Sequence, residues 1–125
     1  MIVIDASAFI DAFAGNEAVL RRIAGEDLHA PHLLDVEVAS ALRRLALAGE
    51  IEVRDAEAVL ATLTEVNLTR HSHVPLLGPI WALRRSIGAY DAVYVALAAA
   101  LRAPLLTTDR KLAAAPDLLI VVEVL

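Results

Sequence analysis

The 125-residue sequence contains no cysteine. This absence excludes a disulfide framework, a zinc–thiolate site and a catalytic thiol, and it suits a reducing, cytoplasmic setting. A chain of this length buries about two-thirds of its unfolded surface, so folding needs neither a metal nor a crosslink. The sequence also has no internal repeat, low-complexity tract or linker. We therefore expect residues 1–125 to form a single domain.

Long apolar runs and positive charge are scarce as well. The longest apolar stretch, Ala92 to Leu101, has about half of the roughly 20 residues that a membrane-spanning helix requires. No basic segment followed by an apolar one opens the chain, so we expect no secretion signal and no membrane contact. The formal net charge is −5, which argues against binding nucleic acid by bulk electrostatics. Any contact with nucleic acid must therefore be local.

The sequence does contain short apolar runs that alternate with helical patterns. The runs are typical of strands buried on both faces, and they lie at residues 1–4, 28–30, 68–71, 105–107 and 119–124. Helical patterns lie at residues 7–13, 17–24, 32–48, 55–66, 79–86, 90–102 and 109–114. This alternation predicts an α/β fold, a three-layer α/β/α sandwich around a central, mainly parallel sheet of short strands.

Two aspartates lie at the ends of predicted strands. Asp5 directly follows the first strand, and Asp109 comes two residues after the strand at residues 105–107. In open parallel sheets, ligands bind beyond the carboxyl ends of the strands. Each aspartate taken alone can equally be a helix N-cap. Their role therefore depends on which other side chains reach this edge.

Glu37 is harder to explain as a structural residue. In the helix predicted over residues 32–48 it comes three residues after Leu34 and four before Ala41, on or beside the apolar stripe. A buried carboxylate without a partner is costly or becomes protonated, so Glu37 needs an arginine or a cation. Asp35 points about 160° away from Glu37 around the helix, and we expect it to be exposed.

Asp91 opens the alanine-rich helix predicted over residues 90–102, where an acid is favourable simply because it faces the helix dipole. Together with Asp5, Glu37 and Asp109 it completes a set of four acids that can converge. Four carboxylates in one pocket would repel one another strongly unless a cation neutralised them. Because all the ligands are oxygens, the cation predicted is Mg²⁺, with Mn²⁺ as a substitute.

Four segments carry a resemblance to a known family, and the third is the most specific. They are IVIDAS at residues 2–7, PHLLDVEVA at 31–39, YDAVYVALA at 90–98 and LLTTD at 105–109. In order and spacing they resemble the PIN-domain family, and within it the VapC-type toxins of prokaryotic toxin–antitoxin pairs. The resemblance covers essentially the whole chain and implies a PIN-like sandwich.

The resemblance also implies an activity and partners. VapC-type proteins are magnesium-dependent endoribonucleases that leave 5′-phosphate and 3′-hydroxyl ends. They are usually homodimers, and a small cognate antitoxin of the VapB type inhibits them by inserting a segment near the active site. We therefore expect an RNA substrate, an antitoxin partner and a homodimer for this chain.

By position, the resemblance assigns the site. The residues that match the family's acidic quartet are Asp5, Glu37, Asp91 and Asp109. Asp5 and Asp91 are expected to hold the principal Mg²⁺, while Glu37 and Asp109 complete its shell or form a weaker second site. Ser7 and Thr107 match hydroxyl residues that orient these carboxylates.

Several neighbouring residues are candidates for lesser roles. The basic residues closest in sequence to Asp91 and Asp109, and therefore candidates for the RNA backbone, are Arg84, Arg85, Arg110 and Lys111. Each of them can instead be a solvated surface residue. The sequence pattern favours exposed positions for His71 and His73, and core or dimer contacts for Trp81 and Tyr94.

Other classes fit this pattern less well. A haloacid-dehalogenase type of enzyme needs a second aspartate where Ser7 stands. A phospho-receiver domain needs a lysine after a late strand, whereas Lys111, the only lysine, lies in a predicted helix. The alternatives that stay open are a PIN-fold binding or scaffold module and a non-toxin nuclease without a cognate antitoxin.

Overall fold

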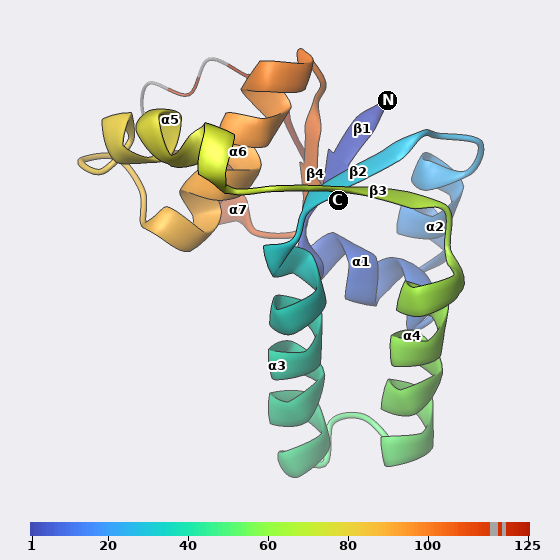
Figure 1. Cartoon of the computed structure of the whole chain (residues 1–125). Coiled ribbons are helices and arrows are strands. Elements are labelled where there is room, and N and C mark those ends of the chain that lie inside the picture. The colour runs from blue at the N-terminus through green and yellow to red at the C-terminus, as the bar shows by residue number, and fades with distance from the viewer. Residues whose placement is uncertain (116–117, 119) are drawn as a thin grey trace.

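The computed structural model describes residues 1–115, 118 and 120–125, and strands alternate with helices along it (Figure 1). The strands are β1 (Ile2–Ile4), β2 (Leu28–Pro31), β3 (Leu68–His71), β4 (Leu105–Thr107) and β5 (Val122–Val124). The helices are α1 (Ala6–Phe13), α2 (Glu17–Ile23), α3 (Leu33–Leu47), α4 (Val53–Glu65), α5 (Leu77–Ala82), α6 (Ala89–Leu101) and α7 (Arg110–Ala113), with a 3₁₀ turn, η1 (Val74–Leu76).

The five strands form one parallel sheet in the order β3-β2-β1-β4-β5. β1 is central, because Ile2 is paired with Leu28 of β2 and Val3 with Leu105 of β4. The chain moves outward from β1 to β3 and then returns to the other side of β1, where it forms β4 and β5. A topological switch point therefore lies between β1 and β4, at the edge where ligands bind in such folds.

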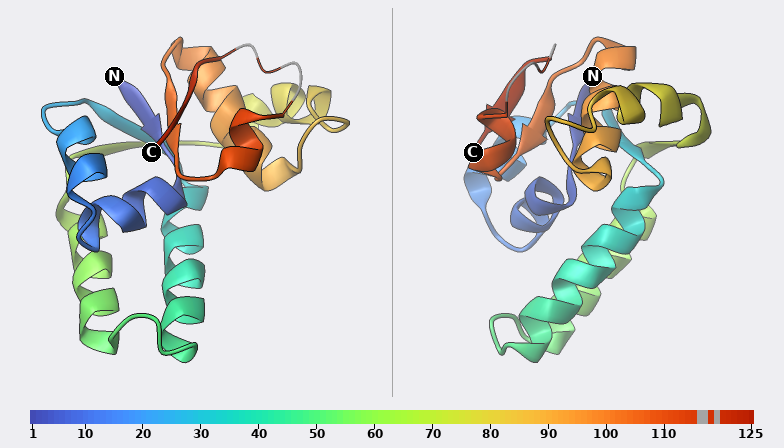
Figure 2. Two further views of the ribbon diagram at one scale, coloured as in Figure 1. Left: turned by 180° about the vertical axis from the view of Figure 1, so that it is seen from behind. Right: turned by 90° about the vertical axis from the view of Figure 1, so that its left-hand side faces the viewer.

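Helices cover both faces of the sheet. α6 packs against β1, β2 and β4, and α1 lies on the opposite face beside α2 (Figure 2). Ile2, Val3 and Ile4 are fully buried, and so are Leu105 and Leu106. Strands covered on both faces cannot alternate apolar and polar residues, which explains their continuous apolar runs. The three-layer α/β/α prediction is confirmed, with the described strands all parallel.

α3 and α4 form an antiparallel hairpin that projects away from the sheet (Figure 1). Gly49 follows α3 with a φ of +73°, so a glycine there ends the helix in the left-handed conformation, as expected. The sequence predicts that this helix begins at residue 55, but the N–H groups of Asp55 and Ala56 both donate to the carbonyl of Glu52. The helix therefore begins at Val53, earlier than the sequence predicts.

Two other boundaries differ from the sequence prediction. A helix is predicted over residues 79–86, but α5 ends at Ala82, and Gly88 precedes α6 as its N-cap. Its φ of −69° is extended backbone, so this glycine does not supply a left-handed turn. The last strand was expected over residues 119–124; it begins at Val122, and residue 119 lies outside the described residues.

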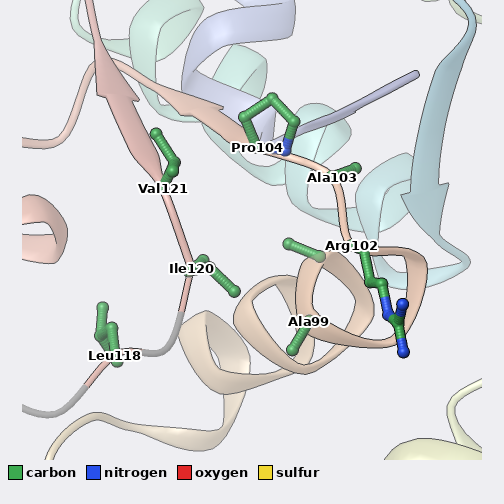
Figure 3. A pocket seen from close by; sticks show the side chains of 8 residues that line it. Ala99, Arg102, Ala103, Pro104, Leu118, Ile120 and Val121 are labelled. Atoms are coloured by element: carbon green, nitrogen blue, oxygen red, sulfur yellow. The ribbon is translucent and has the colours of Figure 1, made fainter.

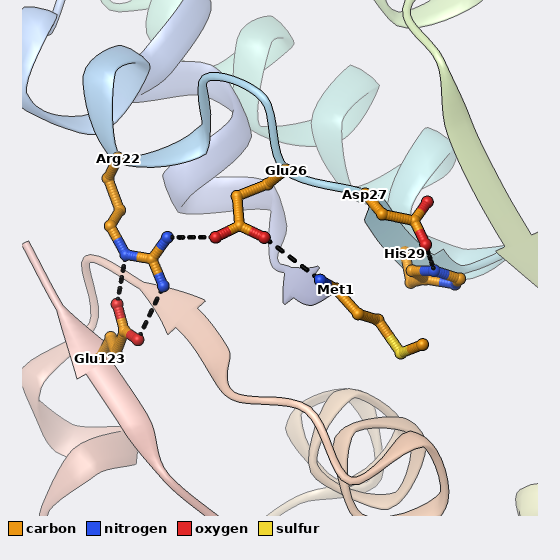
Figure 4. A network of polar contacts seen from close by, with 6 residues as sticks. All are labelled: Met1, Arg22, Glu26, Asp27, His29 and Glu123. Carbon is orange, nitrogen blue, oxygen red and sulfur yellow. Dashed lines mark hydrogen bonds and ion pairs between the residues drawn. The ribbon is translucent and has the colours of Figure 1, made fainter.

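An ion-pair network joins α2 to the last strand (Figure 4). The Arg22 guanidinium donates from Nε and Nη2 to the two carboxylate oxygens of Glu123, at 2.7 and 2.8 Å. Its Nη1 donates to Glu26, which also accepts from the N-terminal ammonium of Met1 at 3.2 Å. The pKa of Glu123 is lowered, first because of its hydrogen bonds from Arg22. This network connects β5, which is one of the two edge strands of the sheet, to α2 and to the N-terminus.

Within the described residues, no helix is both long and apolar enough for a membrane crossing.

Candidate active site

A pocket of about 210 Å³ opens where the four predicted acids meet. Asp5 caps α1 directly after β1, and Asp109 caps α7 shortly after β4. Glu37 reaches the pocket from α3 and Asp91 from the first turn of α6. The remaining residues that line it are Ala6, Ser7, Ala41, Arg44 and Tyr94. The structure thus brings all four acids to the switch point between β1 and β4.

Asp5 is the most enclosed of the four acids, with 9% of the residue exposed. Its Oδ1 atom accepts hydrogen bonds from Ser7 Oγ at 2.7 Å and from the Ala8 N–H at 2.9 Å. The bond from the Ala8 N–H is the helix N-cap bond that the sequence indicates as the structural role of Asp5. Both bonds go to Oδ1, which leaves Oδ2 without a hydrogen bond from the described residues. Asp5 therefore caps a helix and also presents an oxygen to the pocket.

The hydroxyls of Ser7 and Thr107 link the ends of β1 and β4. Ser7 Oγ gives its one hydrogen to Asp5, so in its 3.3 Å contact with Thr107 the threonine hydroxyl is the donor. Ser7 Oγ also accepts from the Thr108 N–H, at 3.1 Å, and Thr107 Oγ1 accepts from the Asp109 N–H at 3.0 Å. A directed chain of hydrogen bonds thus runs from the Asp109 backbone to the Asp5 carboxylate.

Glu37 is half-buried, and its partner is a tyrosine. The Tyr94 hydroxyl donates to Glu37 Oε1 at 2.6 Å. The sequence predicted an arginine or a cation as this partner; no arginine among the described residues pairs with Glu37. Tyr94 itself is buried in the core, as expected, and only its hydroxyl reaches the pocket. Burial and the bond to Glu37 raise the pKa of this hydroxyl well above its usual range, so it stays a donor.

The acids of the pocket destabilise one another's charged forms. Burial is the main cause that raises the pKa of Asp5, Glu37 and Asp91 above the usual carboxylate range. Repulsion adds to it: Asp109 raises the pKa of both Asp5 and Asp91, and Asp5 and Asp91 raise that of Glu37. The hydrogen bonds from Ser7 and Tyr94 offset part of this effect. The four acids are thus electrostatically coupled to one another.

No three His, Asp or Glu side chains in the described part of the chain are placed so that one metal ion could bind all of them. The pocket is thus a group of carboxylates around a small space, and not a closed metal cage.

Arg44 lines the pocket, and the sequence reasoning missed it. The available signal was helical spacing, because seven residues make almost two turns and place Arg44 on the same face as Glu37. None of the four basic residues favoured from sequence lines the pocket. Arg84 lies over the Trp81 ring, 4.9 Å from its centroid, and donates to the Trp81 carbonyl. Trp81 is 68% exposed, so of the two expected roles, core contact or dimer contact, the structure rules out the first.

Arg85, Arg110 and Lys111 are all exposed, the last two in the first turn of α7 beside Asp109. Their contact with RNA stays a prediction.

The histidines and Asp35 also differ from expectation. His71 and His73 are partly buried, because His71 Nε2 lies 2.8 Å from His29 Nδ1 and His73 Nε2 accepts from the Leu33 N–H. Burial lowers the pKa of His71, and neighbouring histidines add to the effect. Asp35 was expected to be exposed, but it is partly buried and accepts hydrogen bonds from Arg70 at 2.8 to 3.0 Å. These polar residues support the packing of β2, β3 and α3.

A second hollow, of about 430 Å³, lies on another part of the surface (Figure 3). Its lining is almost wholly apolar and includes the end of α6 and residues just before β5. The residues that line it are Ala98, Ala99, Arg102, Ala103, Pro104, Leu118, Ile120 and Val121. None of the predicted site residues contributes to it, so we place the candidate active site at the acidic pocket.

Comparison with known families agrees with this fold. Residues 2–118 match the family described as PIN domain. The match spans all the elements from β1 to α7. The chain therefore belongs to the PIN-domain family.

Similar proteins of known name show to which group within the PIN-domain family the chain belongs. The chain is 50% identical over 121 residues to Ribonuclease VapC1 of Mycobacterium tuberculosis, covering 93% of this chain and 91% of the relative. It is 45% identical over 112 residues to Ribonuclease VapC9 of the same species, covering 90% and 88%. Within the PIN-domain family, the chain thus falls among the VapC proteins.

Solved structures share the fold. The protein PAE2754 from Pyrobaculum aerophilum superposes with a TM-score of 0.71 at 27% identity, covering 90% of this chain and 77% of that one. VapBC2 from Rickettsia felis, solved with a DNA fragment of its promoter, gives a TM-score of 0.70 at 14% identity over 100% and 99% of the chains. At the latter identity the likeness concerns the fold alone.

Proposed function

We propose that this protein is a divalent-metal-dependent endoribonuclease and the toxin of a VapBC-type toxin–antitoxin pair. The observation that carries the proposal is the pocket that Asp5, Glu37, Asp91 and Asp109 line at the switch point of a parallel sheet. Relatives that are 45% and 50% identical over nine-tenths of this chain bear the name ribonuclease, which supports it. We take residues 1–125 as one catalytic domain, since the described core residues form one cluster.

The donor set of the pocket fits Mg²⁺, with Mn²⁺ as a substitute. All four acids offer oxygen, the ligand atom that these hard cations prefer. Asp5 and Asp91 would hold the principal ion, with Glu37 and Asp109 in its shell or at a weaker second site. Magnesium commonly uses one or two protein carboxylates and keeps several waters, so it does not need a cluster of three carboxylates. The raised pKa values support this fit, because burial and, to a smaller extent, mutual repulsion disfavour the charged carboxylates, which a cation would stabilise.

In the proposed mechanism, water attacks a phosphodiester in line and the P–O3′ bond breaks, leaving a 5′-phosphate and a 3′-hydroxyl. The cation would supply a lowered pKa for the attacking water and charge neutralisation for the phosphate. The protein supplies positioning: the chain through Thr107 and Ser7 fixes Oδ1 of Asp5 and leaves Oδ2 for the pocket. Tyr94 similarly fixes Oε1 of Glu37 and leaves Oε2 to accept a proton from water.

The test uses purified protein and total RNA, with cleavage products mapped at their ends. Cleavage should require Mg²⁺ or Mn²⁺, stop with EDTA, and vanish in Asp5→Asn and Asp91→Asn. Asp55→Asn is the matched control, because Asp55 is an exposed aspartate of α4 that lies outside the acidic pocket. Full activity of the two Asn variants would overturn the site. If the wild-type protein cuts no RNA and its expression is harmless, the scaffold interpretation is right.

The proposal includes a cognate VapB-type antitoxin. A solved neighbour is a toxin–antitoxin complex from Klebsiella pneumoniae, with a TM-score of 0.63 at 16% identity, and this likeness supports the shared fold. In cells, expression of the chain should arrest growth, and the small protein encoded beside it should restore growth and co-purify with the chain. Growth arrest that the neighbouring gene does not relieve would favour a non-toxin nuclease. A cytoplasmic location stays a prediction from the sequence.

The homodimer is part of the same proposal, and exposed apolar side chains support it. A shallow apolar groove between the start of α3, α5 and α6 is bordered by Leu77 and Tyr90, which are 56% and 69% exposed. Leu77→Glu should convert the dimer to a monomer in light scattering. Leu47→Glu on α3 is the control, because Leu47 is also exposed but lies outside this groove. A wild-type monomer at micromolar concentration would contradict the dimer.

A further inference from the structure

One side chain of the acidic pocket has the opposite charge to the rest. Arg44 lines the pocket together with Glu37 and Ala41, all from α3. These three residues share one helix face, and Arg44 lies about 10 Å along the helix axis from Glu37. An arginine therefore stands at a short, fixed distance from the acids of the proposed site.

The guanidinium of Arg44 has no structural partner among the described residues. Among the described residues, no carboxylate oxygen lies within 4.0 Å of a guanidinium nitrogen of Arg44, the limit for an ion pair. The Arg44 side chain also makes no hydrogen bond to these residues. Other arginines do have structural partners: Arg22 binds Glu123, Arg70 binds Asp35, and Arg84 lies over Trp81. The residue is exposed and lines the pocket, and its guanidinium offers five N–H donors.

RNA needs local positive charge to reach this pocket. The chain has a net charge of −5, and the four carboxylates add repulsion where the phosphate must bind. A cation held by the acids compensates for their charge at the cleaved phosphate. A flanking phosphate requires a separate partner, and the planar fork of arginine matches phosphate oxygens with two parallel hydrogen bonds.

We propose that Arg44 binds a phosphate of the RNA strand next to the one that is cleaved. The inference rests on the proposed nuclease function and names a positioning residue for it. Because Arg44 lies about 10 Å from Glu37 along α3, it can contact the phosphate of a neighbouring nucleotide. This contact fixes the position of the RNA strand relative to the acidic pocket. It contributes to binding without reading the base, because phosphate contacts position a nucleic acid while base contacts specify the sequence.

The test compares Arg44→Gln with Arg43→Gln. Arg43 is the matched control, because it is the adjacent exposed arginine, lies about 100° away around the helix and does not line the pocket. Binding of a fluorescein-labelled single-stranded RNA is measured by anisotropy in EDTA, across a series of salt concentrations. Arg44→Gln should weaken binding about tenfold at low salt. It should also reduce the slope of log affinity against log salt by about 0.7, the change expected when the protein neutralises one phosphate fewer on a single strand.

The controls separate a phosphate contact from a structural role. Arg43→Gln should keep the wild-type slope, and Arg44→Lys should restore the slope but only part of the affinity, because it keeps the charge without the fork. In cleavage assays with Mg²⁺, Arg44→Gln should raise KM more than it lowers kcat. Equal slopes for the Arg44→Gln and Arg43→Gln variants, or weaker binding without a slope change, would overturn the inference. Failure of the nuclease function is distinct, because the wild-type protein would then cut no RNA at all.

Discussion

Thr107 offers the sharpest test of how the fold holds the site. Its side chain is fully buried, its hydroxyl accepts from the Asp109 N–H, and its contact with Ser7 continues to Asp5. Thr107→Val keeps the shape of the side chain and replaces this hydroxyl with a methyl group. The substitution leaves the Asp109 N–H without an acceptor and removes one of the two donors to Ser7.

The expected loss follows from these two effects. The Asp109 N–H is only partly buried, so leaving it without a partner costs part of the about 1–3 kcal/mol that a fully buried donor would lose. The added methyl group offsets about 0.8 kcal/mol of that by its own burial. We therefore expect Thr107→Val to lower the free energy of unfolding by about 1 kcal/mol and the Tm by roughly 4 °C. Cleavage should fall as well, since Asp5 is then held less firmly.

The assay is urea unfolding followed by circular dichroism, at one protein concentration because a dimer would make stability concentration-dependent. Thr108→Val is the control, since the Thr108 hydroxyl makes no hydrogen bond among the described residues; its effect should stay within about 0.5 kcal/mol. Thr107→Ser keeps the hydroxyl and should retain cleavage. If Thr107→Val and Thr108→Val unfold at the same urea concentration with equal m-values, the hydrogen-bond chain does not stabilise the site.

Three further predictions follow from the same structure. Asp91→Asn should abolish cleavage yet melt at the wild-type temperature or above, because it relieves like-charge repulsion; a large drop in Tm would contradict this. Mg²⁺ at about ten times its Kd should stabilise the wild-type protein by about 1.4 kcal/mol in calorimetry and stabilise Asp91→Asn less; equal shifts would place the ion elsewhere. Glu123→Gln should lower stability at pH 7 by about 0.5 kcal/mol, since Glu123 and Arg22 are partly exposed. The lowered pKa of Glu123 makes its contribution full above the unfolded pKa and lost as the pH falls through the folded one; a difference unchanged at pH 3 would refute this.

The strands and the four acids were predictable because their signals are local. An apolar run such as Ile2–Ile4 marks a strand buried on both faces, and Asp5 at its end lies at the edge where parallel sheets bind ligands. Glu37 stood out because a carboxylate beside an apolar stripe needs a partner. These inferences need only periodicity and spacing, which the sequence contains directly.

The partners of these residues were not predictable, because they come from distant parts of the chain. Glu37 bonds to Tyr94, 57 positions away, and Asp35 to Arg70, 35 positions away. No local pattern says which phenol or guanidinium will face a given carboxylate. Gly88 illustrates a different limit, because glycine is favourable both at a helix N-cap and just after a helix end. Its sequence context does not distinguish the two.

The central position of β1 has a consequence for how the protein is made. Asp5 directly follows β1, but the neighbouring strand β4 and Asp109 come about a hundred positions later in the chain. Pairing over such a distance must close a long loop, which is slow compared with local helix formation. At roughly 5–20 residues per second, several seconds of translation separate the two halves of the site. A growing chain therefore carries Asp5 without the complete pocket until Asp109 has been synthesised and β4 has paired with β1.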